Sequence, residues 1–188
     1  MKIGIFGGSF NPIHKSHVKV VEEILDKKIF DEIWIVPCYA HNLGKSLEKY
    51  EDRLKMISLA FEGTLQVKIC EIEKGRNGTS KTYETILELR EKYNHEFVLI
   101  VGSDILYEID KWSNSEKLLK EASFVIYSRE NFPIFVKEGM KIIYVLSEKI
   151  DNISSTEIRE KINNGLSISK EVPVSVEDFI NEKGLYRQ

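Results

Sequence analysis

KIGIF at residues 2–6 runs directly into GGSFNPIHKSH at residues 7–17. The apolar pentapeptide predicts a buried strand, and the amphipathic stretch from about Lys15 to Lys28 predicts a helix. A second apolar run, from Glu32 to Val36, follows this helix. A strand, a helix and a strand in this order are typical of a βαβ unit, in which the two strands are parallel. The first part of the sequence therefore predicts an α/β fold.

The same alternation continues along the rest of the sequence. Apolar spacing predicts helices at 49–61 and 82–93, and apolar runs predict strands at 65–72, 97–101, 123–127 and 141–145. Ser154 and Glu157 have the spacing of a capping box that opens a helix, and Gly184 is expected to stop a last helix from about Ser175. We expect a doubly wound, mostly parallel sheet with helices on both faces. We also expect a single domain over residues 1–188, with a small helical carboxyl-terminal part from about 150.

Composition narrows the classes of function. Hydrophobic residues make up 42% and charged residues 30% of the 188 residues, as in ordinary globular proteins. The net charge of −3 gives no overall attraction to nucleic acid. Cys38 and Cys70 form neither a C-x-x-C pair nor a disulfide framework, and we expect both to be small buried apolar residues. With no signal peptide and no apolar run of about 20 residues, we expect a cytoplasmic location and no membrane partner.

The segment after the first predicted strand can bind phosphate. Gly7 and Gly8 let a backbone approach a ligand closely, and ligands of doubly wound sheets bind beyond the carboxyl ends of the strands. His14 and His17 are three residues apart, so the first turn of a helix would place their imidazoles side by side. Other readings remain open. A glycine pair is also common in turns that bind no phosphate. The two histidines could bind zinc, although no third ligand lies nearby in the motif, and either histidine could have a structural role.

A second candidate anion site lies near the carboxyl end, in ISSTEIR at 153–159. The start of a helix offers unpaired N–H groups, the hydroxyl groups add donors, and Arg159 follows one turn later. A capped helix with a surface arginine would have the same sequence.

These two segments resemble known motifs. Residues 7–17 are similar to the G-G-x-F-x-P-x-H-x-G-H signature of the nucleotidyltransferase superfamily with a His-x-Gly-His motif, with Ser16 in place of glycine. Residues 153–159 resemble the I-S-S-T-x-I-R motif with which that superfamily holds the β and γ phosphates of ATP. The resemblance implies His14, His17 and Arg159 as catalytic residues. It implies an ATP site made of Gly7, Gly8, Ser9, Phe10, Gly102, Asp104, Ser154, Ser155 and Thr156.

The middle of the chain resembles the nicotinate and nicotinamide mononucleotide adenylyltransferases. Gly102-Ser103-Asp104 is similar to their G-[AS]-D segment, and Trp112 falls where they have a tryptophan. The resemblance implies Lys45, Thr82 and Trp112 as substrate-binding residues. Two positions depart from the family: Lys81 replaces a tyrosine, and the 37–45 loop is atypical. Trp112 could instead be a core aromatic residue, and Asp104 a helix cap.

The resemblance implies transfer of AMP from ATP to nicotinate mononucleotide, with Mg²⁺ bridging phosphate oxygens and no metal site of the protein's own. A phosphopantetheine adenylyltransferase, a cytidylyltransferase and a nucleotide-binding regulator without catalysis are the alternatives. The sequence leaves open the preference for nicotinate or nicotinamide, and whether the chain forms homo-oligomers.

Overall fold

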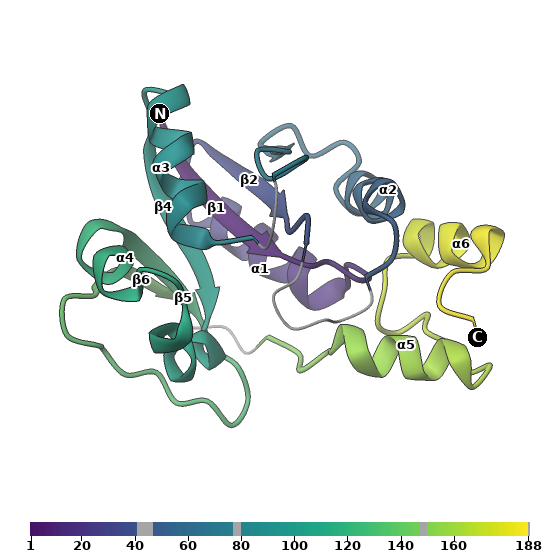
Figure 1. Ribbon diagram of the computed structural model, residues 1–188. Coiled ribbons are helices and arrows are strands. Elements are labelled where there is room, and N and C mark those ends of the chain that lie inside the picture. Colours follow the sequence, from purple (N-terminus) through teal and green to yellow (C-terminus); the bar gives the residue numbers. More distant parts are fainter. Residues whose placement is uncertain (41–46, 77–79, 147–149, 188) are drawn as a thin grey trace.

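The computed structural model describes residues 1–40, 47–76, 80–146 and 150–187, and its centre is one six-stranded sheet (Figure 1). The strands are β1 (Lys2–Gly8), β2 (Glu32–Pro37), β3 (Val67–Ile69), β4 (Glu96–Gly102), β5 (Ser123–Tyr127) and β6 (Lys141–Leu146). They lie in the order β3-β2-β1-β4-β5-β6, and every neighbouring pair is parallel. The predicted doubly wound parallel sheet is confirmed.

Six α-helices and two short 3₁₀-helices accompany these strands within the described residues, and the last two α-helices follow β6. They are α1 (Lys15–Asp26), α2 (Tyr50–Ala60), α3 (Thr82–Lys92), η1 (Ser103–Tyr107), η2 (Ile109–Lys111), α4 (Ser115–Glu121), α5 (Ser155–Asn163) and α6 (Val174–Lys183). None of the helices in these ranges is long and apolar enough to cross a membrane.

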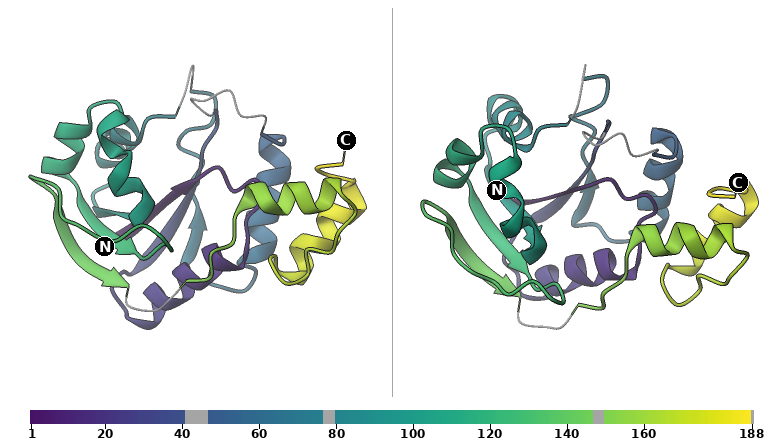
Figure 2. Two further views of the ribbon diagram at one scale, coloured as in Figure 1. Left: turned by 90° about the horizontal axis from the view of Figure 1, so that it is seen from below. Right: turned by 60° about the horizontal axis from the view of Figure 1, so that its bottom comes forward.

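The helices cover both faces of the sheet because successive side chains of a strand point to opposite faces. In β1, Ile3 and Ile5 belong to one apolar cluster and Phe6 to another. Helices α3 and α4 complete the first cluster, whereas α1, α2, α5 and α6 complete the second, so α1 and α3 lie on opposite sides of the sheet (Figure 2). The carboxyl-terminal helices therefore share an apolar cluster with the sheet.

Two parts of the fold differ from the sequence predictions. The strand expected at 65–72 spans only Val67–Ile69, because Leu65 is 90% exposed and residues 72–75 form a turn. The helices η1, η2 and α4, between β4 and β5, were not predicted. They are three to seven residues long, and so short a segment shows little periodicity.

The strand order places a binding region between β1 and β4. From β1 the chain adds β2 and β3 on one side, and from β4 it adds β5 and β6 on the other. The connections therefore leave β1 and β4 in opposite directions, and a crevice forms beyond their carboxyl ends. Gly8 and Gly102 are the last residues of these two strands.

Candidate active site

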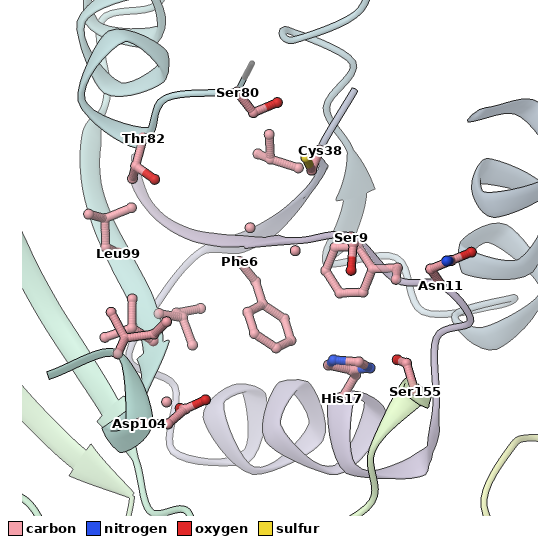
Figure 3. A pocket seen from close by; sticks show the side chains of 18 of the residues that line it. Phe6, Ser9, Asn11, His17, Cys38, Ser80, Thr82, Leu99, Asp104 and Ser155 are labelled. Atoms are coloured by element: carbon pink, nitrogen blue, oxygen red, sulfur yellow. The ribbon is translucent and has the colours of Figure 1, made fainter. Parts of the chain in front are cut away.

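A cavity of about 670 Å³ lies at this point in the sheet and collects nearly all the predicted site residues (Figure 3). Its lining includes Gly7, Gly8, Ser9, Phe10, His14, His17, Thr82, Gly102, Asp104, Trp112, Ser154, Ser155, Thr156 and Arg159. Lys45, the remaining one, lies outside the described residues. Segments from opposite ends of the chain thus meet at one site.

The glycine pair belongs to the end of β1 rather than to a loop. Gly7 and Gly8 pair with Val36 and Pro37 of β2, so they are extended and make no sharp turn. Gly8 is needed for space, because a Cβ atom there would lie 3.1 Å from the ring of Phe10. Phe10 itself is fully buried with a φ of 46°, in the left-handed region. The turn therefore comes after the glycines, and they let a ligand approach the end of the strand.

The two histidines stack on each other. Their ring centroids are 3.6 Å apart with an angle of 23° between the planes, which confirms the predicted side-by-side arrangement. His14 caps α1 and donates its backbone N–H to Nδ1 of His17 at 3.3 Å. An Nδ1 that accepts a hydrogen bond carries no proton, so in the neutral ring of His17 the proton is on Nε2. His17 therefore offers an N–H donor at Nε2.

Burial keeps both imidazoles neutral. Burial first, and then the positive charge of Arg129, lower the pKa of His14 from 6.5 to about 3. The pKa of His17 is also far below 6.5, because of burial first and then of His14 and Arg129. In the free protein the pair therefore offers hydrogen bonds rather than positive charge at neutral pH.

Helix α5 is fastened to the segment between β1 and α1. The Ser155 hydroxyl donates to the carbonyl oxygen of Pro12 at 2.8 Å, and Arg159 Nη1 donates to that of Asn11 at 2.7 Å. Arg159 Nη2 also donates to Thr156 Oγ1 at 3.2 Å. Figure 3 shows Asn11, His17 and Ser155 together at one end of the cavity. These contacts bring the guanidinium group and the imidazoles to the same cavity.

The three hydroxyl groups at the start of α5 make different hydrogen bonds. Ser154 caps the helix by accepting a bond from the amide of Thr156 at 3.2 Å, and this bond replaces the expected capping box with Glu157. Because Ser154 and Thr156 both accept through their oxygens, their hydroxyl protons can go to a ligand. The proton of Ser155 is directed to Pro12 instead.

Ser16, which replaces the glycine of the motif, does not line the cavity. Its side chain is buried and donates to the carbonyl oxygen of Asp151 at 2.6 Å. The hydroxyl therefore ties α1 to the segment before α5.

The ends of β4 and β5 present a carboxylate and an unpredicted cation. A Cβ atom on Gly102 would lie 2.3 Å from Asp104 Oδ1, so only glycine leaves room for this carboxylate. Arg129 Nε lies 3.8 Å from the same oxygen, and its Nη2 contacts the Tyr127 hydroxyl at 3.4 Å. Arg129 follows β5 by two residues, so a closer reading of the residues after each strand would have found it.

The opposite end of the cavity is formed by α3 and η2. Thr82 is the first residue of α3, and the neighbouring Lys81 forms an ion pair with Glu84 at 2.9 Å. Trp112 lines the cavity and also packs against the apolar cluster of α3 and α4, so its core role and its site role are compatible.

Glu73 is a buried carboxylate at this end that the sequence did not reveal. One oxygen accepts from the Thr85 hydroxyl at 2.7 Å, and the other is buried without a hydrogen-bond partner in the described part of the chain. Cys38 lines the same region but is only half-buried, as is Cys70, which corrects the expectation for both. Burial raises the pKa of both thiols, so they remain protonated at neutral pH.

Arg53 is a third unpredicted residue, with a structural task beside the cavity. It is 1% exposed and donates to the carbonyl oxygens of Ser9 at 2.7 Å and Glu48 at 3.1 Å. A guanidinium group can donate in several fixed directions at once. Arg53 thus holds the residue that follows the glycine pair.

Metal binding by side chains alone has little support in this geometry. Within the ranges that the structure describes, no three His, Cys, Asp or Glu residues are grouped so that they could hold a metal ion.

Residues 5–161 match the family model described as cytidylyltransferase-like. Similar proteins include one from Hydrogenobaculum sp., 35% identical over 187 residues, with 99% of this chain and 98% of the relative covered. Another is from Staphylococcus epidermidis, 38% identical over 188 residues, with 98% and 97% covered. Both are named as probable nicotinate-nucleotide adenylyltransferases.

Solved structures are similar as well. One is the nicotinic acid mononucleotide adenylyltransferase of Plasmodium falciparum complexed with NaAD, with a TM-score of 0.88 and 27% identity. The match covers 98% of this chain and 97% of the other. The same enzyme complexed with APC has a TM-score of 0.86 and 26% identity, and the match covers 98% of this chain and 96% of the other.

Proposed function

We propose that this chain, which belongs to the nicotinate-nucleotide adenylyltransferase family, transfers AMP from ATP to nicotinate mononucleotide and releases pyrophosphate. One observation carries the proposal. A stacked pair of neutral imidazoles, an arginine and the start of a helix meet at one end of a cavity large enough for a nucleotide. Each of these groups donates hydrogen bonds, and a triphosphate needs many donors along its length.

The reaction follows from the charges of the substrates. An oxygen of the 5′-phosphate of the mononucleotide attacks the α-phosphorus of ATP, and a new P–O bond forms. The bond between the α-phosphorus and the bridging oxygen breaks, and its electron pair leaves with pyrophosphate. The attacking phosphate is already ionised at neutral pH, so no general base is required. Catalysis then consists of positioning and of stabilising the charge of the transition state.

The phosphate groups lie along the wall formed by β1, α1 and α5. The Nε2–H donor of His17 and the ring of His14 bind oxygens of the α and β phosphates. Arg159 supplies the positive charge that the neutral imidazoles lack, and holds the leaving pyrophosphate with the hydroxyl protons of Ser154 and Thr156. Gly7, Gly8, Ser9 and Phe10 form the close backbone surface beneath the nucleotide.

The nucleoside and the acceptor occupy the remaining surfaces. Oδ1 of Asp104, which accepts no hydrogen bond from the described residues and lies 3.8 Å from Arg129 Nε, accepts from the ribose or the amine of the nucleotide, beside Gly102. Trp112 stacks on the pyridine ring, and Thr82 faces its carboxylate. Lys45 is the proposed phosphate ligand of the acceptor, outside the described residues.

We assign the metal to the substrate rather than to the protein. Mg²⁺ keeps several waters and binds phosphate oxygens readily, so ATP brings the ion with it. We place the reaction in the cytoplasm, because a reducing compartment suits the free thiols of Cys38 and Cys70.

Pyrophosphate release with ATP tests the proposal directly. Nicotinate mononucleotide should support turnover, whereas phosphopantetheine in its place, or CTP in place of ATP, should not. Turnover that favours either of these, or nucleotide binding without turnover, overturns the assignment. His17→Ala should lower kcat about 100-fold, as expected for a lost donor to the transition state. His95→Ala changes a histidine outside the cavity and should leave kcat unchanged.

A further inference from the structure

Three separate parts of the chain converge on Asn11, which is only 2% exposed. Its side-chain oxygen accepts from the backbone N–H of Glu48 at 3.1 Å and from the hydroxyl of Tyr186 at 3.0 Å. Its carbonyl oxygen accepts from Arg159 at 2.7 Å. Asn11 therefore connects the turn after α6 to the arginine of the phosphate wall.

The end of the chain is built so that Tyr186 faces Asn11. Gly184 ends α6 in the left-handed region with a φ of 63°, and Leu185 is buried and donates its N–H to Ile180 at 3.0 Å. Tyr186 also has a φ of 63°, which is uncommon for an aromatic residue. The turn thus holds a strained conformation at the residue whose hydroxyl reaches Asn11.

The hydroxyl of Tyr186 remains a donor at neutral and moderately alkaline pH. Burial raises its pKa, and the nearby carboxylate of Glu48 raises it further. Because Asn11 Oδ1 can only accept, the direction of this hydrogen bond is fixed.

From this geometry we infer that Tyr186 is a positioning residue for ATP. Its hydrogen bond fixes Asn11, and the carbonyl oxygen of Asn11 in turn fixes the guanidinium group of Arg159. This inference rests on the proposed function for the role of Arg159 and adds a requirement for the carboxyl-terminal turn. Thr82 begins α3 and Trp112 follows η2, at the end of the cavity opposite Asn11, so we expect the acceptor substrate to be insensitive to this turn.

Tyr186→Phe removes the hydroxyl and keeps the ring. The loss of one hydrogen bond to the loop should lower kcat/KM for ATP and weaken ATP binding by about 3- to 10-fold, with KM for nicotinate mononucleotide unchanged. In the Asn11→Ala background the same substitution should have no further effect. Tyr107→Phe is the matched control, because Tyr107 donates an equally long bond of 3.0 Å, to Pro133, outside this wall.

Three results would overturn the inference. The first is an unchanged ATP affinity in Tyr186→Phe. The second is an equal loss of affinity for both substrates together with a melting temperature below that of Tyr107→Phe, and the third is a further loss of ATP affinity when Tyr186→Phe is added to Asn11→Ala. ATP binding by calorimetry keeps this test apart from the proposed function. If the wild type binds ATP but releases no pyrophosphate, the proposed function fails, and the affinities still decide the role of Tyr186.

Discussion

The buried histidine pair should make the protein lose stability as the pH falls below 6.5. Burial lowers the pKa of His14 to about 3 in the folded protein, whereas an unfolded chain binds that proton near pH 6.5. Between these values the unfolded state carries a proton that the folded state lacks. The free energy of unfolding therefore falls as the pH falls through this window, and stability is full above it.

At pH 5 the expected loss of stability follows from the pKa of histidine in the unfolded chain. This pH is about 1.5 units below the unfolded pKa, and each unit corresponds to about 1.4 kcal/mol. His14 alone should therefore cost about 2 kcal/mol between pH 7.5 and pH 5, and His17 adds a cost of the same sign. A typical domain has only about 5–15 kcal/mol of stability, so a loss of this size is measurable.

Urea unfolding at pH 7.5, 6 and 5 measures the free energy directly. His14→Asn removes one titrating ring, so its loss between pH 7.5 and pH 5 should be about 2 kcal/mol smaller than that of the wild type. The two proteins are compared by how much their free energy of unfolding changes between pH 7.5 and pH 5. Any destabilisation by the substitution that does not depend on pH therefore cancels. Equal losses in the two proteins would refute the claim that His14 is neutral because it is buried.

Three further substitutions test close contacts of the site. Gly102→Ala places a Cβ atom 2.3 Å from Asp104 and should raise KM for ATP about 10-fold in steady-state assays, because the carboxylate is displaced. If Gly102→Ala raises KM for ATP further in the Asp104→Ala background, displacement of the carboxylate is not the cause. Arg53→Lys replaces the separate Nε–H and Nη1–H donors by a single ammonium nitrogen and should lower the free energy of unfolding by about 2 kcal/mol in urea. An unchanged free energy of unfolding would contradict its structural task. Arg129→Met removes a charge that lowers the pKa of His14, so the loss of stability between pH 7.5 and 5 should shrink rather than grow.

The sequence predicted the centre of the fold well because parallel strands are buried on both faces. The strands β1, β2, β4 and β5 read as nearly continuous apolar runs, and no helix pattern competes with them. At the edge of the sheet this signal weakens. The edge strand β3 pairs with β2 over three residues, and exposed Leu65 and the turn at 72–75 limit its length.

The candidate site was predictable where a local motif carries it. The spacing of His14 and His17 gave their side-by-side rings, since the start of a helix imposes that geometry. Arg53 and Glu73 gave no such signal. Arg53 bonds to backbone carbonyl groups, one of them 44 residues away, and Glu73 bonds to Thr85 in another element. Contacts with a distant backbone leave no pattern in the sequence.

Burial is the property that changes the chemistry of the motif. Two histidines beside a phosphate suggest positive charge when only the sequence is read, but the fold encloses them and makes both neutral. On the proposed function, the positive charge for ATP then comes from the arginines that line the cavity, Arg129 and Arg159, and each is placed by a different element. Arg159 is held against Asn11 by α5, and Arg129 is held near Asp104 by the end of β5. The imidazoles can therefore donate fixed hydrogen bonds in a cavity that two permanent cations also line. Such an arrangement keeps its charge over a wider pH range than a pair of protonated histidines would, because guanidinium groups do not titrate near neutral pH.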